Sequence, residues 1–265
     1  MKKPVKTFPK TIVTVLILIV ILIVVVNLYG DLGVKWGIET AGKKTLNVGV
    51  KVEKARLGIL SGTLGLENLV IDNPKEYQNP HLLELDSGKI QVNIGSLLSD
   101  VVKIKEIKLD GVNVTLEQKD VRGNNIQDIL KNIPTAETQP SGKKLHIEIL
   151  EISNINVKVK LLPIPGRADT LTLPLDKITM TNLGEDNKLD TAQLVSKILV
   201  AITTAIAKEG AGVLPNDVIG PLNTSLKQLE QLSQTLMKGG EDLQKKTKDI
   251  TEGIKDLIKP KKEDQ

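Results

Sequence analysis

Alternating apolar and polar residues run through the chain from about residue 48 to residue 183, which is the pattern of β-strands with one buried face. Two stretches of this region, 102–118 (VKIKEIKLDGVNVTLEQ) and 145–161 (LHIEILEISNINVKVKL), carry the same apolar pattern at an offset of 43 residues. The matched positions are Val102, Ile104, Leu109, Val112, Val114 and Leu116 in the first stretch and Leu145, Ile147, Ile152, Ile155, Val157 and Val159 in the second. Such self-similarity indicates one supersecondary unit that is used more than once to extend a sheet. Two unrelated amphipathic hairpins would also resemble each other, so both interpretations stay open.

A strong turn signal, Asp110-Gly111, lies between two alternating runs in the first stretch. This dipeptide is typical of a two-residue β-hairpin with antiparallel strands. The alternation also slips by one residue between Ile104 and Ile107, as a β-bulge would produce. A single kinked strand through 102–118 is the alternative to the hairpin.

The apolar residues of the chain are almost entirely aliphatic. The chain is 40% hydrophobic but only 2% aromatic, so Leu, Ile and Val must supply nearly all of the buried surface. It has no cysteine, which excludes disulfides and thiolate metal sites. The formal net charge of +4 comes from the four lysines of residues 1–10, and the remaining 32 basic and 32 acidic residues cancel. This neutral remainder argues against nucleic-acid binding, which needs a net positive surface.

Residues 11–29 (TIVTVLILIVILIVVVNLY) form a run in which threonine and asparagine are the only markedly polar residues. As a helix the run would be about 28 Å long, which matches the hydrocarbon core of a bilayer. A cleaved signal peptide is the alternative, but its apolar core is shorter and ends at a small-x-small site that this run lacks. We therefore expect an uncleaved single-pass anchor after a basic flank at 1–10. The lysines of the flank predict a cytoplasmic N-terminus, with everything after Leu32 on the far side of the membrane.

Helices are expected within and after the strand region. The segment NNIQDIL begins with asparagines that can cap a short helix at 125–132, and Pro134 lies just past its end. The segment DTAQLVSKILVAITTAIAKEG opens with Asp190 as a helix cap and carries a broad apolar stripe. It predicts a helix at 191–208 that covers an apolar face of the sheet, because such a stripe must be buried.

The segment 217–258 repeats apolar residues every 3.5 positions, and a charged tail follows at 259–265. One interpretation is amphipathic helices, one or two in number, that pack on their own domain. The other is a coiled-coil seam for self-association or for an envelope protein partner. The seam candidates are Leu222, Leu226, Leu229, Leu236, Leu243, Ile250, Ile254 and Leu257.

The sequence contains no recognisable catalytic arrangement. The two histidines, His81 and His146, lie in unrelated contexts, and there is no Gly-x-Ser-x-Gly motif or set of carboxylates at metal-ligand spacing. Residues 37–45 (GIETAGKKT) resemble a phosphate-binding loop only superficially, because Lys44 stands where a Ser or Thr should reach the magnesium. We expect a protein that is not an enzyme and that needs no cofactor or metal.

The segments LGLENLVIDNP, GSLLSDVVKIKEIKLDG and NNIQDIL, taken together with the N-terminal apolar run, resemble the AsmA family of bacterial envelope proteins. The resemblance covers roughly residues 1–133 well and 145–210 loosely. The chain departs from large family members by being short, by ending in the heptad segment, and by having Gly111 in place of the usual proline of the strand turn. The resemblance implies a curved antiparallel sheet that forms a hydrophobic groove or half-barrel for lipid acyl chains, as in lipid carriers between the inner and outer membranes.

These features predict an α+β protein of the bacterial inner membrane, with an N-terminal transmembrane helix, an AsmA-like periplasmic domain at 33–210, and C-terminal amphipathic helices. The resemblance implies that the domain binds phospholipid acyl chains and supports phospholipid transport or outer-membrane assembly. The candidate groove residues are Ile90, Val92, Ile94, Ile104, Ile107, Leu109, Val112, Val114, Ile155 and Val157. One alternative is a closed core under the helix at 191–208, with no ligand. The other is a non-transporting scaffold that acts through the heptad segment.

Overall fold

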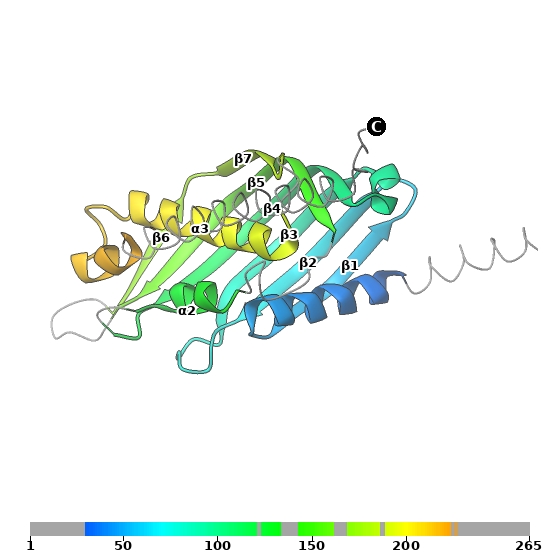
Figure 1. Ribbon diagram of the computed structural model, residues 1–265. Helices are drawn as coiled ribbons and strands as arrows, with labels where there is room; N and C mark the ends of the chain where they lie inside the picture. The colour runs from blue at the N-terminus through cyan, green and yellow to red at the C-terminus, as the bar shows by residue number, and fades with distance from the viewer. Residues whose placement is uncertain are drawn as a thin grey trace, which may run out of the picture.

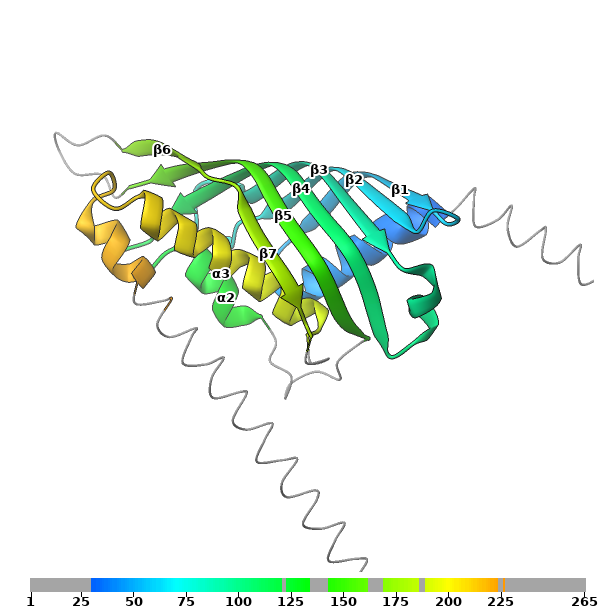
Figure 2. The same ribbon diagram turned by 90° about the horizontal axis from the view of Figure 1, so that it is seen from above.

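The structure, a computed structural model, describes residues 30–120, 123–133, 143–161, 169–185, 189–223 and 226. These residues form an α+β fold, in which one open, curved, seven-stranded sheet carries helices on one of its faces (Figure 1, Figure 2). The predicted anchor at 11–29, the basic flank, most of the heptad segment and the charged tail lie outside the described residues.

The sheet has the strand order β1-β2-β3-β4-β5-β6. Its strands are β1 (Val50–Gly58), β2 (Thr63–Asp72), β3 (His81–Val92), β4 (Val101–Glu117), β5 (Lys144–Lys160), β6 (Thr170–Leu175) and β7 (Ile178–Leu183). β6 and β7 both pair with β5, β6 with residues 155–160 and β7 with residues 147–152. The two short strands therefore divide one edge of the long strand β5 between them.

The helices of the described residues are one over residues 30–46, α2 (Asn125–Asn132), α3 (Thr191–Glu209) and one over residues 216–223, together with the 3₁₀-helix η1 (Ile94–Leu98). The predicted caps of α2 and α3 are confirmed, because each helix begins with a capping box, Asn124 with Gln127 and Asp190 with Gln193. The described helices other than η1 lie on the inward face of the sheet (Figure 2).

The helix over residues 30–46 runs along β1, the edge strand of the sheet. Asp31 Oδ1 accepts a hydrogen bond of 2.7 Å from the backbone N–H of Leu57, and Glu39 Oε1 accepts one of 2.9 Å from the backbone N–H of Val52. Two backbone groups that an open edge would leave unpaired are thereby satisfied by carboxylates of this helix. The bonds also place the start of the helix at the end of β1 that leads into β2.

β4 and β5 are parallel neighbours, which corrects the prediction of an antiparallel sheet. They pair from Val101 with Lys144 to Glu117 with Lys160, at the same offset of 43 residues throughout as the sequence repeat. Parallel strands need a crossover connection of a dozen or more residues, and residues 118–143, which include α2, provide it. The repeat therefore consists of two long strands that lie side by side in register. The other strand pairs are antiparallel.

The dipeptide Asp110-Gly111 makes no turn. β4 continues through both residues, so the predicted hairpin is wrong and the single kinked strand is correct. Gly111 has a φ of 72° and lies opposite Asp86 of β3, whose Oδ2 would be 2.1 Å from a Cβ atom at this position. A strand irregularity that leaves no room for a side chain explains why a turn-like sequence occurs inside a strand.

The predicted bulge between Ile104 and Ile107 is confirmed. The register between β3 and β4 shifts at this point and leaves Lys105 as an extra residue in β4. Because of this extra residue, Ile104 and Ile107 are both buried on the inward face although their spacing does not fit simple alternation.

A line of irregular residues crosses the sheet near the middle of its strands. Asn68 in β2, Gly111 in β4 and Asn154 in β5 have positive φ values of 50°, 72° and 51°, and Asp86 of β3 lies opposite both Asn68 and Gly111. At this line the inward-facing positions shift by one residue in each strand from β1 to β5. Since every strand makes the same shift, the apolar residues on both sides of the line stay on one face of the sheet.

Candidate functional site

The inward face of the sheet is made of aliphatic rows that run from strand to strand, each formed by residues that pair across the strands. On one side of the irregular line the rows are Val50, Ile71, Leu83, Val114, Val157, Leu173 and Val52, Leu69, Leu85, Val112, Ile155, Leu175. On the other side they are Ala55, Leu66, Gly88, Leu109, Ile152, Ile178 and Leu57, Leu64, Ile90, Ile107, Leu150, Met180. None of these side chains is aromatic or charged. The inward-facing rows thus consist of Leu, Ile, Val, Met, Ala and Gly.

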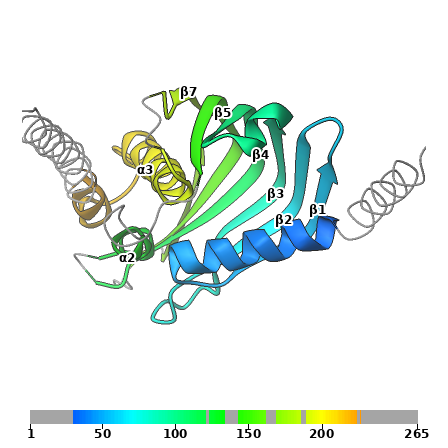
Figure 3. The same ribbon diagram turned by 45° about the vertical axis from the view of Figure 1, so that its right-hand side comes forward.

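Helices cover the two margins of this face. Val34 and Ile38 of the helix over residues 30–46 pack on Val52, Ala55 and Leu66 of β1 and β2. α3 packs on β5, β6 and β7 at the opposite margin, and α2 contacts β4 and α3. Figure 3 shows these helices on either side of the middle strands.

Between the two covered margins lies a set of partly buried apolar side chains, which we call the aliphatic strip. It consists of Leu69 and Ile71 of β2, Ile90 and Val92 of β3, and Leu109 of β4. These residues contact the main core from the inward face, yet none of them is fully buried. The strip is therefore a part of the inward face that stays partly accessible from outside.

The outward face of the sheet is polar and solvated. Arg56 and Lys54 of β1 pair with Glu67 of β2 at 2.5 and 3.3 Å, and Lys108 pairs with Glu106 at 2.7 Å within β4. The hydrogen bond and charge of Glu106 raise the pKa of Lys108. Exposed ion pairs of this kind add little stability. They distinguish the two faces, since the outward side carries charged pairs where the inward side carries aliphatic rows.

The structure places nine of the ten candidate groove residues on the inward face. Six of them are buried, namely Ile104, Ile107, Val112, Val114, Ile155 and Val157, and three are partly buried, namely Ile90, Val92 and Leu109. Ile94 is the exception, since its side chain is 43% exposed in η1. Ile94 lies outside the sheet because β3 ends at Val92, so the alternation expected to continue to Ile94 stops two residues earlier.

Two residues of the aliphatic strip, Leu69 and Ile71, are missing from the sequence-based candidates. Their signal is present, since Leu64, Leu66, Leu69 and Ile71 are the apolar positions of a strand. Leu66 and Leu69 are three residues apart, with the positive φ of Asn68 between them. Simple alternation therefore does not show that all four residues face inward.

A buried polar cluster closes the end of the sheet next to α2. Both carboxylate oxygens of Glu117 accept hydrogen bonds, one from the backbone N–H of Gln78 at 2.8 Å and the other from the backbone and side chain of Asn79 at 2.9 and 2.6 Å. Burial by itself raises the pKa of Glu117, but these hydrogen bonds outweigh it and hold the pKa below its usual range. The ionised carboxylate thereby fixes the loop between β2 and β3 to the end of β4.

Tyr77 joins the same loop to α2. Its hydroxyl group donates a hydrogen bond of 2.6 Å to Asp128 Oδ2. Burial, together with this bond, raises the pKa of the Tyr77 phenol far above its usual value. In the described part of the chain, no three His, Asp or Glu side chains are grouped so that they could hold a metal ion.

Comparison with protein families identifies the chain. The model of the AsmA family matches residues 1–172. The chain belongs to the AsmA family. Membership of the AsmA family suggests an envelope-associated, lipid-related function. No curated protein and no solved structure gives a significant match.

The match to the AsmA family ends at residue 172, within β6. It therefore includes the helix over residues 30–46, strands β1 to β5 and α2, which together contain the whole aliphatic strip and the polar cluster. α3 and the heptad segment lie beyond the matched residues.

Among the described residues of this AsmA-family chain, one helix, α3, has the length and apolar composition of a membrane-spanning segment. Its residues Leu194, Leu199, Ile202 and Ile206 are buried, and the helix packs on the sheet. α3 thus buries part of its apolar surface against the sheet that it covers.

Two of the predicted seam residues fall within the described part of the chain. Leu222 is fully buried in the main core, and Leu226 is half-buried. The other seam candidates, Leu229, Leu236, Leu243, Ile250, Ile254 and Leu257, lie outside the described residues. The burial of Leu222 means that this residue packs on its own domain and is not available to a partner.

Proposed function

We propose that this AsmA-family protein is anchored in the bacterial inner membrane and holds phospholipid acyl chains on the inward face of its sheet. In this role it supports phospholipid transport or outer-membrane assembly without catalysing a reaction. The observation that carries the proposal is the aliphatic strip, because a contiguous apolar surface that stays accessible to solvent is typical of a binding site.

The chemistry of the strip suits an acyl chain. Burial of apolar surface stabilises by roughly 25 cal/mol per Å² and does not depend on how the two groups are oriented. A flexible hydrocarbon chain is therefore stabilised in many positions along the strip. None of the strip residues offers a side-chain hydrogen bond that would fix a ligand in one place. Such a surface holds acyl chains and lets them slide, which is what a carrier requires.

The dimensions of the sheet support the same proposal. A strand of 17 residues, such as β4, is about 55 Å long at roughly 3.3 Å per residue. One leaflet of the hydrocarbon core is about 15 Å thick, so the inward face is longer than one acyl chain. The sheet is comparable in length to one bilayer with its headgroups, about 40–45 Å. We therefore propose that it passes lipid to a partner or to a second copy and does not bridge two membranes alone.

The anchor and its orientation complete the proposal. The apolar run at 11–29 crosses the inner membrane, the lysines of residues 1–10 stay in the cytoplasm, and the sheet lies in the periplasm. Phospholipid leaving the outer leaflet of that membrane then meets the inward face directly.

The test compares two neighbouring residues that face opposite ways on β2. Ile71 belongs to the aliphatic strip, whereas Val70 faces outward in a row with Glu84 and Asn113. Full-length Ile71→Lys and Val70→Lys proteins are purified in mild detergent, and bound phospholipid is counted by native mass spectrometry. We expect Ile71→Lys to lose most of its bound lipid and Val70→Lys to retain the wild-type amount.

This pair is a sharper test than charges at Val112 or Val114. Those side chains are only 1% and 3% exposed, so a lysine there would unfold the domain and remove lipid for that reason alone. Thermal unfolding of both β2 variants establishes that they are folded. Equal lipid occupancy in folded Ile71→Lys and Val70→Lys would rule out the inward face as the lipid-binding surface.

A further inference from the structure

Exposed aliphatic side chains gather at one end of the sheet, where we define an apolar rim. The rim comprises Leu32 of the helix over residues 30–46, Ile59 and Leu60 of the turn between β1 and β2, and Ile94, Leu97 and Leu98 of η1. Leu60 and Leu98 are 97% and 96% exposed, and Leu32 is 64% exposed. These three side chains bury little of their surface in the protein itself, so the fold does not account for their apolar character.

Hydrogen bonds hold the three segments of the rim together. Asp31 beside Leu32 bonds to Leu57 at the end of β1. The backbone oxygen of Gly62 accepts a hydrogen bond of 2.8 Å from the N–H of Val92, two residues before Ile94. Figure 2 shows the turn after β1, η1 and the start of the helix over residues 30–46 at the same end of the sheet.

The position of the rim along the chain points to what covers it. The apolar run at 11–29 ends immediately before residue 30, and Leu32 is the third residue after the run. Since a residue spans at most about 3.6 Å, Leu32 lies within roughly 11 Å of the end of a membrane anchor. A membrane surface at the end of this run would therefore be close to the Leu32 part of the rim.

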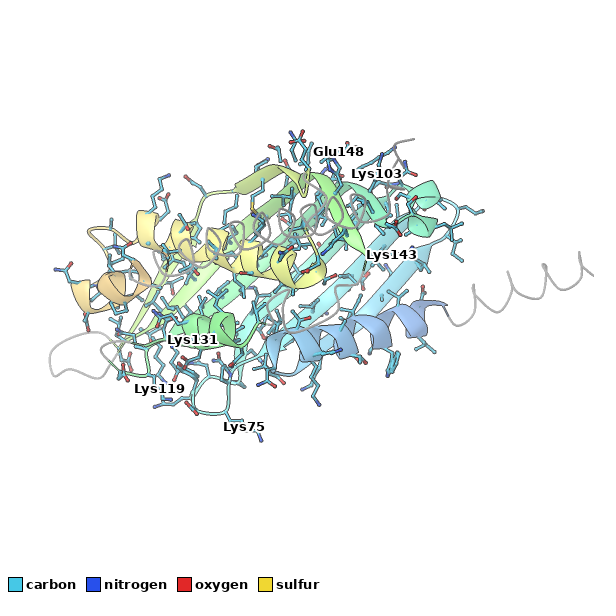
Figure 4. All side chains as sticks on the ribbon, in the orientation of Figure 1. Lys75, Lys103, Lys119, Lys131, Lys143 and Glu148 are labelled. Atoms are coloured by element: carbon cyan, nitrogen blue, oxygen red, sulfur yellow. The ribbon has the colours of Figure 1, made fainter. Side chains whose placement is uncertain are left out.

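The residues around the rim fit a bilayer surface. Trp36 is exposed one helical turn after Leu32, and tryptophan is enriched where a membrane meets water. Lys143 donates hydrogen bonds to the backbone oxygens of Leu97 and Ser99, and Lys103 is exposed beside η1 (Figure 4). Lysines next to protruding leucines match the anionic phosphates above the acyl layer.

We propose that the apolar rim inserts into the outer leaflet of the membrane that holds the anchor, with Leu60 and Leu98 reaching the acyl region. The inference rests on the proposed anchor at 11–29. Insertion places this end of the inward face against the bilayer, so that acyl chains move from the leaflet onto the aliphatic strip without crossing water.

The test uses the absence of native cysteine. Single Leu60→Cys and Leu98→Cys proteins, full length, are labelled with an environment-sensitive fluorophore and reconstituted into vesicles of phosphatidylethanolamine and phosphatidylglycerol. A matched Lys75→Cys protein carries the label on the exposed loop after β2, at the opposite end of the sheet (Figure 4). We expect emission from positions 60 and 98 to shift to the blue and to be quenched several-fold by brominated lipids, with no such change at position 75.

Emission and quenching at positions 60 and 98 equal to those at position 75 would overturn the inference. So would shielding of these labels that depends on protein concentration and not on brominated lipid, because the rim would then contact a second copy. The proposed function fails in a different experiment, the lipid occupancy of Ile71→Lys. Quenched rim labels combined with unchanged occupancy would support membrane insertion and refute the lipid-binding strip.

Discussion

The side-chain amide of Asn125, at the start of α2, donates a hydrogen bond of 2.8 Å to Oδ1 of Asn73, which follows β2. The same amide donates to the backbone oxygen of Thr115 at 2.6 Å, and its oxygen accepts from the backbone N–H groups of Glu117 and Ile126. Asn125 is 0% exposed and all of its side-chain hydrogen-bonding groups are used. The NLVIDNP and NNIQDIL segments, 52 residues apart at these two asparagines, therefore form one polar joint.

Replacing Asn125 by aspartate tests this joint. Asn125→Asp keeps both acceptor positions but removes both donors, which leaves Asn73 Oδ1 and Thr115 O unpaired beside a buried charge. We expect the free energy of unfolding to fall by about 2–5 kcal/mol, measured by urea denaturation in detergent solution. Asn156→Asp, on the exposed outward face of β5, is the matched control and should change it by less than about 0.5 kcal/mol. Equal stability of the two variants would contradict the role of Asn125.

The lowered pKa of Glu117 predicts a pH-dependent contribution to stability. Because the folded pKa lies below the ordinary value of about 4.3, the stabilisation is complete above that value and is lost as the pH falls through the folded pKa. We expect Glu117→Gln to cost about 1.5–3 kcal/mol at neutral pH, and the difference from the wild type to shrink below about pH 4.

Urea unfolding at a series of pH values between about 3 and 7 checks this prediction. Glu84→Gln, at an exposed outward position of β3, serves as the control and should follow the wild type at every pH. A difference between wild type and Glu117→Gln that is the same at both ends of this pH range would mean that the carboxylate charge is not what holds the loop.

Gly111 should be intolerant of any side chain. Gly111→Ala places a Cβ atom against Asp86 in a residue with positive φ, so we expect a loss of about 1–3 kcal/mol. A Cβ atom at Gly65 would lie 3.9 Å from its nearest neighbour, so Gly65→Ala should be neutral or slightly stabilising. In the Gly111→Ala, Asp86→Ala double variant only the part of the loss caused by the carboxylate group should be recovered, because the Cβ atom of residue 86 would still lie 2.7 Å from the new Cβ atom. Denaturation curves that do not distinguish Gly111→Ala from Gly65→Ala would contradict the close approach.

The cap of α3 should control how firmly this helix covers β5 to β7. Asp190 Oδ1 accepts a hydrogen bond of 2.9 Å from the backbone N–H of Gln193, and Asp190 Oδ2 lies 3.7 Å from Lys144 Nζ. We expect Asp190→Ala to lower the free energy of unfolding by about 1–2 kcal/mol and to speed amide hydrogen exchange in α3. Asp176→Ala, in the exposed turn between β6 and β7, should do neither. Unchanged exchange in α3 of the Asp190→Ala protein would mean that packing alone holds the helix.

The sequence was sufficient for the features that depend on local periodicity and capping. The alternation of apolar residues identified the strands, the slip at Ile104 and Ile107 identified the bulge, and the caps of α2 and α3 followed from Asn124 and Asp190. The repeat at an offset of 43 residues corresponds to two similar single strands and not to a repeated supersecondary unit. These features are encoded locally because side-chain spacing and helix caps act within a few residues.

The relative direction of the strands, and which strands pair with each other, were decided by the tertiary structure. Apolar residues at every second position show which face of a strand is apolar. The same pattern fits a hairpin at Gly111 and two parallel strands linked through α2, so it does not tell them apart. The irregular line across Asn68, Gly111 and Asn154 can be recognised only once the strands are paired. The same is true of the apolar rim, because its exposed leucines become neighbours only when the turn after β1, η1 and the helix over residues 30–46 meet at one end of the sheet. Local patterns thus determined the strands and caps of this protein, and long-range pairing determined which of its apolar residues are left exposed together.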